Sequence, residues 1–289
     1  MHRRRLFAER VWYTVTGQVF LLSIAFIGFP FLSEAADQTK IPDIVLDGSL
    51  PIQYSDNVTR VMRNKESDFY FSPYFKVSAT GEVTDSIRYS LYASAGVDTL
   101  YKYTDSDLSN GTLGFQMKKR WDALEVGAFF ERNYYFNKLY DGVFDTTNDI
   151  GLFVRYNYIN PTGDWKIKPG MTITTRTTDT FAVERDLFHV KVDFEHRLAD
   201  RWWIFLTPRL RIYDYVDRSS GRIDAISSIG TGIRYEVTKN IDLTSSIAYE
   251  SRTSGVAGRN YNNMIAGVSL DFSFDTFHSN RDFFEAFHR

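Results

Sequence analysis

The sequence contains no cysteine among its 289 residues. This absence excludes disulfide bonds and thiolate metal sites, and it is compatible with an oxidising compartment. Neither sign of charge dominates, because the formal net charge is −2, so the overall charge does not point to nucleic acid as a partner. Aromatic residues are abundant at 16%, although mean hydropathy is only −0.30. This combination suits half-polar strands, and a secreted β-sandwich would share it.

The first 35 residues have the order of a secretory signal peptide. Basic residues lie within positions 2–10, and an apolar run follows from Val19 to Leu32. Ser33 and Ala35 then supply the small side chains of a cleavage site, so we expect cleavage after Ala35. A membrane anchor is the alternative, but the run is shorter than the roughly 20 residues that a spanning helix needs. After residue 35, no segment has the character of a transmembrane helix.

From residue 68 onward the chain alternates apolar and polar residues with a period of two, which predicts strands with one apolar and one polar face. In segment 263–275, for example, Met264, Val268 and Leu270 share one face, and Ser269 and Asp271 share the other. Twelve segments are predicted as strands: 43–54, 68–78, 85–97, 111–120, 123–136, 147–159, 164–177, 186–198, 201–215, 222–237, 240–251 and 263–275. Such lengths suit tilted membrane-spanning strands better than the shorter strands of a soluble sandwich.

The connections alternate between short and long, which is typical of outer-membrane barrels with short periplasmic turns and long outer loops. The predicted fold is therefore an all-β, antiparallel, up-and-down transmembrane barrel of about twelve strands, with both termini in the periplasm. We expect a signal peptide over 1–35, a barrel over 36–275 and a periplasmic tail over 276–289. The segment 43–67 has the weakest pattern, because Gly48 and Pro51 disfavour a strand. Pro73, Pro169 and Pro208 fall inside strands, where we expect local bulges.

Aromatic residues of the apolar face gather near strand ends. Trp165, Trp202 and Tyr235 lie near predicted periplasmic ends, whereas Phe69 and Tyr249 lie near predicted outer ends. Two such belts mark the two membrane interfaces in known barrels.

The last predicted strand resembles the assembly signal of single-chain outer-membrane β-barrel proteins of Gram-negative bacteria. Its segment from Gly267 through Leu270 and Phe272 to Phe274 alternates apolar residues and ends in aromatic ones. The resemblance implies recognition by the barrel-assembly machinery, although this chain continues to Arg289. Segment 232–243 resembles porin-type barrels that are often found with exported polysaccharides. The resemblance covers residues 43–275 and implies residence in the outer membrane, in contact with its lipid and lipopolysaccharide.

The polar face of the strands predicts a lumen with charges of opposite sign on different walls. A basic wall is predicted from Arg155, Lys166, Lys168, Arg176, Lys191, Arg197, Arg209 and Arg211, partly offset by Asp149, Asp193 and Glu195. An acidic wall is predicted from Glu125, Glu131, Asp224, Glu236, Asp242, Glu250 and Asp271. Such a lumen favours passage of small charged solutes or acidic oligosaccharides. Aromatic residues on the same face, including Tyr92, Phe153 and Trp203, stack sugar rings in one interpretation and plug the lumen in another.

Two other functions stay open at this point. One is a non-conducting structural or surface-interaction barrel, whose lumen is closed by interlocking salt bridges. The other is a lipid hydrolase, which would need a nucleophile and a histidine on or near the outer wall. The candidate histidines are His189, His196, His278 and His288, and no catalytic triad is apparent around them. We expect no cofactor and no metal, because no ligand cluster or phosphate-binding loop appears.

Overall fold

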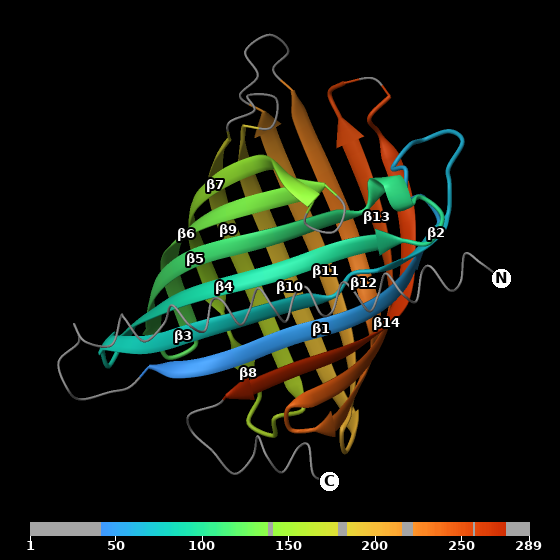
Figure 1. Cartoon of the computed structure of the whole chain (residues 1–289). Coiled ribbons are helices and arrows are strands. Elements are labelled where there is room, and N and C mark those ends of the chain that lie inside the picture. The colour runs from blue at the N-terminus through green and yellow to red at the C-terminus, as the bar shows by residue number, and fades with distance from the viewer. Residues whose placement is uncertain (1–41, 138–140, 179–183, 216–221, 257, 276–289) are drawn as a thin grey trace.

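The computed structural model describes residues 42–137, 141–178, 184–215, 222–256 and 258–275 (Figure 1). The predicted signal peptide over 1–35 and the predicted tail over 276–289 lie outside these ranges. Within the described part of the chain, no helix has the length and the apolar character needed to cross a bilayer.

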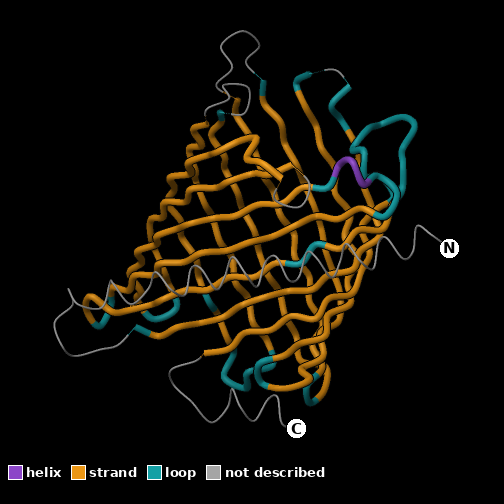
Figure 2. The backbone as a smooth tube through the Cα atoms, viewed as in Figure 1, coloured by secondary structure: helices purple, strands orange, loops and turns teal. Residues whose placement is uncertain are grey.

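The described residues form one antiparallel sheet that closes on itself (Figures 1 and 2). Its strands are β1 (Asp43–Ser55), β2 (Asp68–Phe71), β3 (Tyr74–Thr84), β4 (Ile87–Leu100), β5 (Leu108–Trp121), β6 (Leu124–Asn137), β7 (Asp141–Tyr156), β8 (Tyr158–Ile159), β9 (Trp165–Thr178), β10 (Arg185–Ala199), β11 (Trp202–Tyr215), β12 (Ile223–Thr238), β13 (Ile241–Ser254) and β14 (Tyr261–Asp275). A single turn of 3-10 helix, Thr104–Ser106, lies between β4 and β5.

Twelve segments span the height of the barrel, as the sequence predicts, and we call each of them a stave. Fourteen strands are present, but β2 continues into β3 and β7 continues into β8, so each of these pairs forms one stave. The predicted first strand is present as β1, which pairs with β14 from Val45↔Asp275 to Ser55↔Ile265 and closes the barrel. Closure removes the unpaired edges that an open sheet would expose to lipid.

Side chains alternate between an exposed outer face and a more buried inner face. On β7, Ile150 and Leu152 are 63% and 64% exposed, whereas Asp149 and Phe153 are 5% and 2% exposed. Apolar side chains therefore point outward, and polar or aromatic side chains line the interior. This is the arrangement of a barrel that is surrounded by lipid.

The two ends of the barrel differ in their connections (Figures 1 and 2). Two-residue turns at 85–86, 122–123, 200–201 and 239–240 join strands at one end, which we call the turn end. Two turn residues, Asp122 and Arg201, have φ angles of 46° and 64°, in the left-handed region that tight hairpins require. Longer connections lie at the opposite end, which we call the loop end. The strands predicted over 68–78 and 85–97 leave a connection over 79–84. This prediction was wrong, because β3 continues to Thr84.

Aromatic side chains occupy the outer face at both ends. At the turn end, the rings of Trp202 and Tyr235 lie 4.7 Å apart between centroids, and Trp165 is 45% exposed. At the loop end, the rings of Tyr54 and Phe69 lie 5.2 Å apart. These positions are those that two interfacial belts require.

The prolines inside the strands do not produce the bulges that we expected. Pairing continues in the same register on both sides of Pro73, Pro169 and Pro208. At Pro73 the stave divides into β2 and β3, and next to Pro169 the neighbouring stave divides into β7 and β8. Proline lacks only its own N–H, so the ladder loses a few bridges without gaining a residue.

The loop end is tied down by a buried carboxylate. Asp68 is fully buried, and it accepts hydrogen bonds from the backbone amides of Phe69 (2.8 Å), Lys102 (2.7 Å) and Tyr103 (3.2 Å). A carboxylate that accepts several backbone amides is strongly stabilised. The contact fixes the connection after β4 against the start of β2.

Candidate functional site

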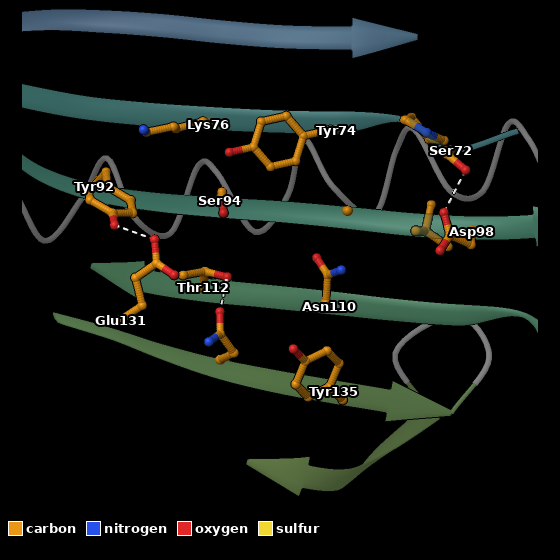
Figure 3. Close-up of a pocket in the computed structure, with 14 residues that line it drawn as sticks. Ser72, Tyr74, Lys76, Tyr92, Ser94, Asp98, Asn110, Thr112, Glu131 and Tyr135 are labelled. Carbon is orange, nitrogen blue, oxygen red and sulfur yellow. Dashed lines mark hydrogen bonds between the residues drawn. The ribbon is translucent and has the colours of Figure 1, made fainter. Parts of the chain in front are cut away.

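One pocket on the inner wall of the barrel is lined by β3 to β6 (Figure 3). We call it the tyrosine pocket, because Tyr74, Tyr92 and Tyr135 line it beside the small residues Ser94 and Gly96. Its volume is about 330 Å³, and its lining is Ser72, Pro73, Tyr74, Lys76, Tyr92, Ser94, Gly96, Val97, Asp98, Asn110, Thr112, Glu131, Asn133 and Tyr135. Small side chains between large rings leave space that is open to the lumen.

Side chains in the tyrosine pocket hold one another in place (Figure 3). The Tyr92 hydroxyl donates a hydrogen bond of 2.6 Å to Glu131 Oε1, and Lys76 Nζ lies 4.3 Å from the centroid of the Tyr92 ring. Thr112 donates to Asn133 Oδ1 at 2.7 Å. The pocket therefore offers donors, acceptors and ring faces together, which suits a ligand rich in hydroxyl groups.

The second pocket lies on the wall formed by β6 to β10, and we call it the basic pocket. Its volume is about 480 Å³, and its lining is Glu125, Arg155, Asn157, Lys168, Pro169, Gly170, Thr172, His189, Lys191 and Asp193. Lys191 forms an ion pair of 2.7 Å with Asp193, and Lys168 forms one of 3.0 Å with Glu195. Arg155 has no carboxylate within 4.0 Å among the described residues, and its guanidinium lies 4.5 Å from the centroid of the Phe153 ring.

Several residues of the predicted basic wall are neutralised by nearby carboxylates. Arg176 donates two hydrogen bonds, of 2.7 and 2.6 Å, to the carboxylate of Asp149. Arg211 donates to Glu250 at 2.7 Å, and Tyr261 donates to the same carboxylate at 2.7 Å. Among the described residues, four members of the basic wall have no carboxylate within 4.0 Å: Arg155, Lys166, Arg197 and Arg209. The uncompensated positive charge therefore lies in the middle and at the turn end of the wall.

Three carboxylates of the predicted acidic wall lie side by side near the turn end. Glu236 lies directly opposite Asp242, which in turn lies opposite Asp271. Asp242 also forms an ion pair of 3.8 Å with Arg234 Nε. Asp271 accepts hydrogen bonds from the hydroxyls of Ser49 (2.5 Å), Thr244 (2.9 Å) and Ser269 (2.9 Å), which are neutral donors.

The remaining members of that wall have specific partners. Glu125 pairs with Lys118 at 3.2 Å. Asp224, at the loop end, receives hydrogen bonds from both Arg222 and Arg252. Sequence reasoning missed Lys76, Lys118, Arg222 and Arg252. The first two alternate in step with the inward-facing residues of their strands, and this pattern could have identified them. The other two lie at strand ends.

Ion pairs between described residues run along the wall of the barrel. Each lies within one strand or joins strands that are no more than two positions apart, such as Arg211 on β11 with Glu250 on β13 and Arg234 on β12 with Glu195 on β10 (2.9 Å). Interlocking pairs across the lumen, which a closed barrel would use, are not present among these residues. The charge network therefore lines the interior and does not bridge it.

Inner aromatic rings lie against glycines of the neighbouring strand. Phe153 covers Gly127, and Phe129 covers Gly151, because a Cβ built on either glycine would lie 2.4 Å from the facing ring. Two more inner pairs have the same form: Tyr92 with Gly114, and Phe205 with Gly232. A ring that lies over a glycine lies close against the wall of the barrel.

The two described histidines lie on opposite faces of the barrel wall. His189 lies on the inner wall, and its Nε2 is buried without a hydrogen-bond partner. His196 stacks on Trp165 on the outer face with 4.1 Å between ring centroids, and its Nδ1 lies 3.3 Å from the backbone oxygen of Asp164. Among the described residues, neither imidazole forms a hydrogen bond with a hydroxyl or a carboxylate side chain. His278 and His288 lie outside the described residues. Within the described ranges, no three His, Asp or Glu side chains are grouped so that they could hold a metal.

Comparison with known proteins identifies the same class of molecule. Residues 170–274 match the family model described as "Putative beta-barrel porin 2". No protein of curated function matches the sequence. Among solved structures, the COG4313 outer membrane channel from Pseudomonas putida F1 is similar, with a TM-score of 0.55 and 9% identity over 83% of this chain and 98% of the other.

Two further solved structures match with lower TM-scores. The translocator domain of the autotransporter NalP from Neisseria meningitidis has a TM-score of 0.45 and 11% identity, over 90% of this chain and 97% of that domain. The anion-selective porin from Comamonas acidovorans has a TM-score of 0.44 and 8% identity, over 81% and 99%. The fold is that of an outer-membrane β-barrel, and residues 170–274 are similar to a porin-type family.

Proposed function

We propose that this barrel is a channel that passes small anionic solutes, including acidic oligosaccharides. The main observation behind this proposal concerns two arginines, Arg155 and Arg209, that are exposed on the inner face. Neither has a carboxylate within 4.0 Å among the described residues. Arg209 lies directly opposite Lys191, so positive charge is concentrated at mid-height of the wall. Guanidinium groups bind carboxylates through two parallel hydrogen bonds, which favours carboxylated solutes.

Two features of the inner wall support conduction over a closed barrel. The ion pairs of the described residues follow the wall, and four inner rings rest on glycines. The acidic row of Glu236, Asp242 and Asp271 lies on another part of the wall, so a solute in the lumen experiences a transverse field. The tyrosine pocket adds a neutral surface of rings, amides and hydroxyls that suits the uncharged part of a saccharide.

The orientation of the barrel in the outer membrane is part of the same proposal. Short turns are periplasmic in barrels of this kind, so the turn end faces the periplasm, as do both termini. The expected partners are outer-membrane lipid and lipopolysaccharide, together with the barrel-assembly machinery, which would read the segment from Gly267 to Phe274. In this segment Phe272 lies over Gly48, and its ring centroid is 5.8 Å from that of Phe75, at the seam where β14 meets β1. The last strand therefore contributes its aromatics to barrel closure.

The test is the reversal potential of the refolded protein in a planar bilayer under a gradient of potassium chloride. We expect an anion-selective current, and the Arg155→Gln and Arg209→Gln variants should each reduce the selectivity. The matched control is Arg132→Gln, because Arg132 lies on the outer face beside Tyr134. This substitution removes the same charge from outside the lumen. A folded barrel without current would refute the channel and leave a structural or surface-interaction role. Lipid hydrolysis by the protein would instead favour the enzyme.

A further inference from the structure

A tryptophan on the inner wall near the turn end is surrounded by three cationic side chains. Trp203, on β11, is 1% exposed. Lys166 Nζ lies 3.9 Å from the centroid of its ring, and the guanidinium carbons of Arg197 and Arg234 lie 4.8 and 5.5 Å from it. Arg197 and Arg234 occupy the positions directly opposite Trp203 on the two neighbouring strands. We call these four residues the Trp203 cluster.

The positive charges of the Trp203 cluster exceed the negative charges that are available to them. Two carboxylates lie near the cluster. Glu195 already pairs with Lys168 at 3.0 Å and with Arg234 at 2.9 Å, and Asp242 lies 3.8 Å from Arg234 Nε. Neither Lys166 nor Arg197 has a carboxylate within 4.0 Å among the described residues. The face of an indole ring attracts a cation, but it carries no formal charge to neutralise one.

The cluster also contains buried donors without acceptors. Trp203 Nε1 and Arg234 Nε are both buried and have no hydrogen-bond partner. A buried indole N–H ordinarily finds a partner, and each exception in a native structure calls for an explanation. Arg234 Nε has a carboxylate oxygen of Asp242 at 3.8 Å, whereas the indole N–H of Trp203 has no acceptor. Lys166 and Arg197 without a carboxylate, and this indole N–H without an acceptor, all lack a negatively charged oxygen nearby.

We propose that the Trp203 cluster is a binding site for an oxyanion, held between Lys166 and Arg197 beside the Trp203 ring. Arg197 is exposed and Lys166 is half-buried, so an anion at the turn end can reach both groups. Charge-assisted hydrogen bonds from an ammonium and a guanidinium are the strongest that a carboxylate or a sulfate receives. Binding of an oxyanion at this site does not depend on the proposed function. That a transported solute occupies the site as it leaves the lumen rests on the proposed function.

The experiment measures binding to the refolded, full barrel in detergent at low ionic strength, because salt would screen the interaction. The probes are sodium sulfate and sodium D-glucuronate, and D-glucose is the neutral comparison. We expect both anions to change the tryptophan fluorescence in a saturable manner and to release heat in a calorimeter, and we expect glucose to do neither. A response to glucuronate that is stronger than the response to sulfate would identify a carboxylated sugar as the better ligand, and the reverse would identify an inorganic anion.

Variants assign the binding to the cluster. Lys166→Gln and Arg197→Gln should each weaken anion binding at least tenfold. Lys166→Arg keeps the positive charge and should retain most of the affinity of the parent protein. The control is Lys119→Gln, because Lys119 lies 4.8 Å from the ring of Trp121 on the outer face and forms a comparable pair outside the lumen. Trp203→Phe keeps a ring face but should abolish the fluorescence change while heat is still released.

Four results would overturn the site. They are the absence of anion binding, equal binding by the Lys166→Gln and Arg197→Gln variants, equal weakening by Lys119→Gln, and an unchanged fluorescence response in Trp203→Phe. Heat-modifiable migration in gels and the far-ultraviolet spectrum confirm that each variant is folded before it is compared. Current through the bilayer is a separate measurement, so a channel without anion binding, or anion binding without a channel, separates this inference from the proposed function.

Discussion

The ring of Tyr92 rests on Gly114, and a single methyl group should lift it off the wall. A Cβ at position 114 would lie 2.2 Å from Tyr92 Cζ, and all three of its nearest atoms belong to this ring. Carbon atoms ordinarily stay about 3.5 Å apart or more, so Gly114→Ala must displace the ring by roughly 1.3 Å. The hydrogen bond of 2.6 Å from Tyr92 to Glu131 is the contact at risk.

The cost of this displacement follows from the lost hydrogen bond. A hydrogen bond to a charged group contributes about 1.5–3 kcal/mol net, so Gly114→Ala should lower the free energy of unfolding by about 2 kcal/mol. Tyr92→Phe removes the same hydrogen bond and should cost a similar amount. Because both changes remove one interaction, the double variant should cost clearly less than the sum of the two.

The measurement is urea unfolding of the barrel in lipid vesicles, followed by tryptophan fluorescence. Gly230→Ala is the matched control, because a Cβ at this position would meet only Ala248 Cβ at 3.6 Å and Ile247 O at 3.9 Å, which are ordinary contacts. It should leave stability within about 0.5 kcal/mol of the parent or raise it slightly. If Gly114→Ala were no more destabilising than Gly230→Ala, or if its cost added fully to that of Tyr92→Phe, the argument for the ring on the glycine would fail.

Three further predictions test other parts of the structure. Arg176→Gln removes two charged hydrogen bonds from the nearly buried Asp149, so it should lower the free energy of unfolding by about 3 kcal/mol in the same urea assay; a cost below about 1 kcal/mol would contradict this. Asp68→Asn leaves at most one oxygen to accept three backbone amides, and hydrogen exchange should accelerate in the connection after β4 while global stability changes little; protection equal to the parent would refute it. Leu152→Arg on the outer face should cost about 2–4 kcal/mol in lipid, whereas Ser246→Arg on the inner face should cost much less, and equal costs would mean that the two faces are assigned wrongly.

The sequence predicts the staves well because each barrel strand separates two solvents, lipid and the lumen. That requirement imposes strict alternation, and the segment predicted over 201–215 corresponds to β11 (Trp202–Tyr215). The errors lie at the ends of strands. We predicted a connection over 137–146, but β7 begins at Asp141 and pairs with β6. Polar residues near the loop end continue the ladder there, since backbone pairing does not need an apolar side chain.

The ion pairs were less predictable than the faces. Parity places Arg211 and Glu250 on the inner wall, but it does not reveal that they meet across the intervening strand β12. Such a contact depends on the register of two hairpins and on the reach of an arginine side chain. Sequence reasoning therefore predicts two walls of opposite sign, whereas the residues that keep uncompensated charge, Arg155 and Arg209 among them, emerge only once the partners are known.

The inner pairs of aromatic ring and glycine select the register of neighbouring strands that no two-residue turn connects. Two-residue turns fix the register of their own hairpins, but the four inner pairs lie between β4 and β5, β6 and β7, and β11 and β12, which are joined at the loop end. A slip of one residue would exchange the two faces of a strand. A slip of two residues keeps the faces but places a Cβ beneath the ring, as Gly127 and Phe153 illustrate with their distance of 2.4 Å. The glycines thus allow one register at positions where turn geometry does not select it, and the rings that select it are the same rings that line the lumen.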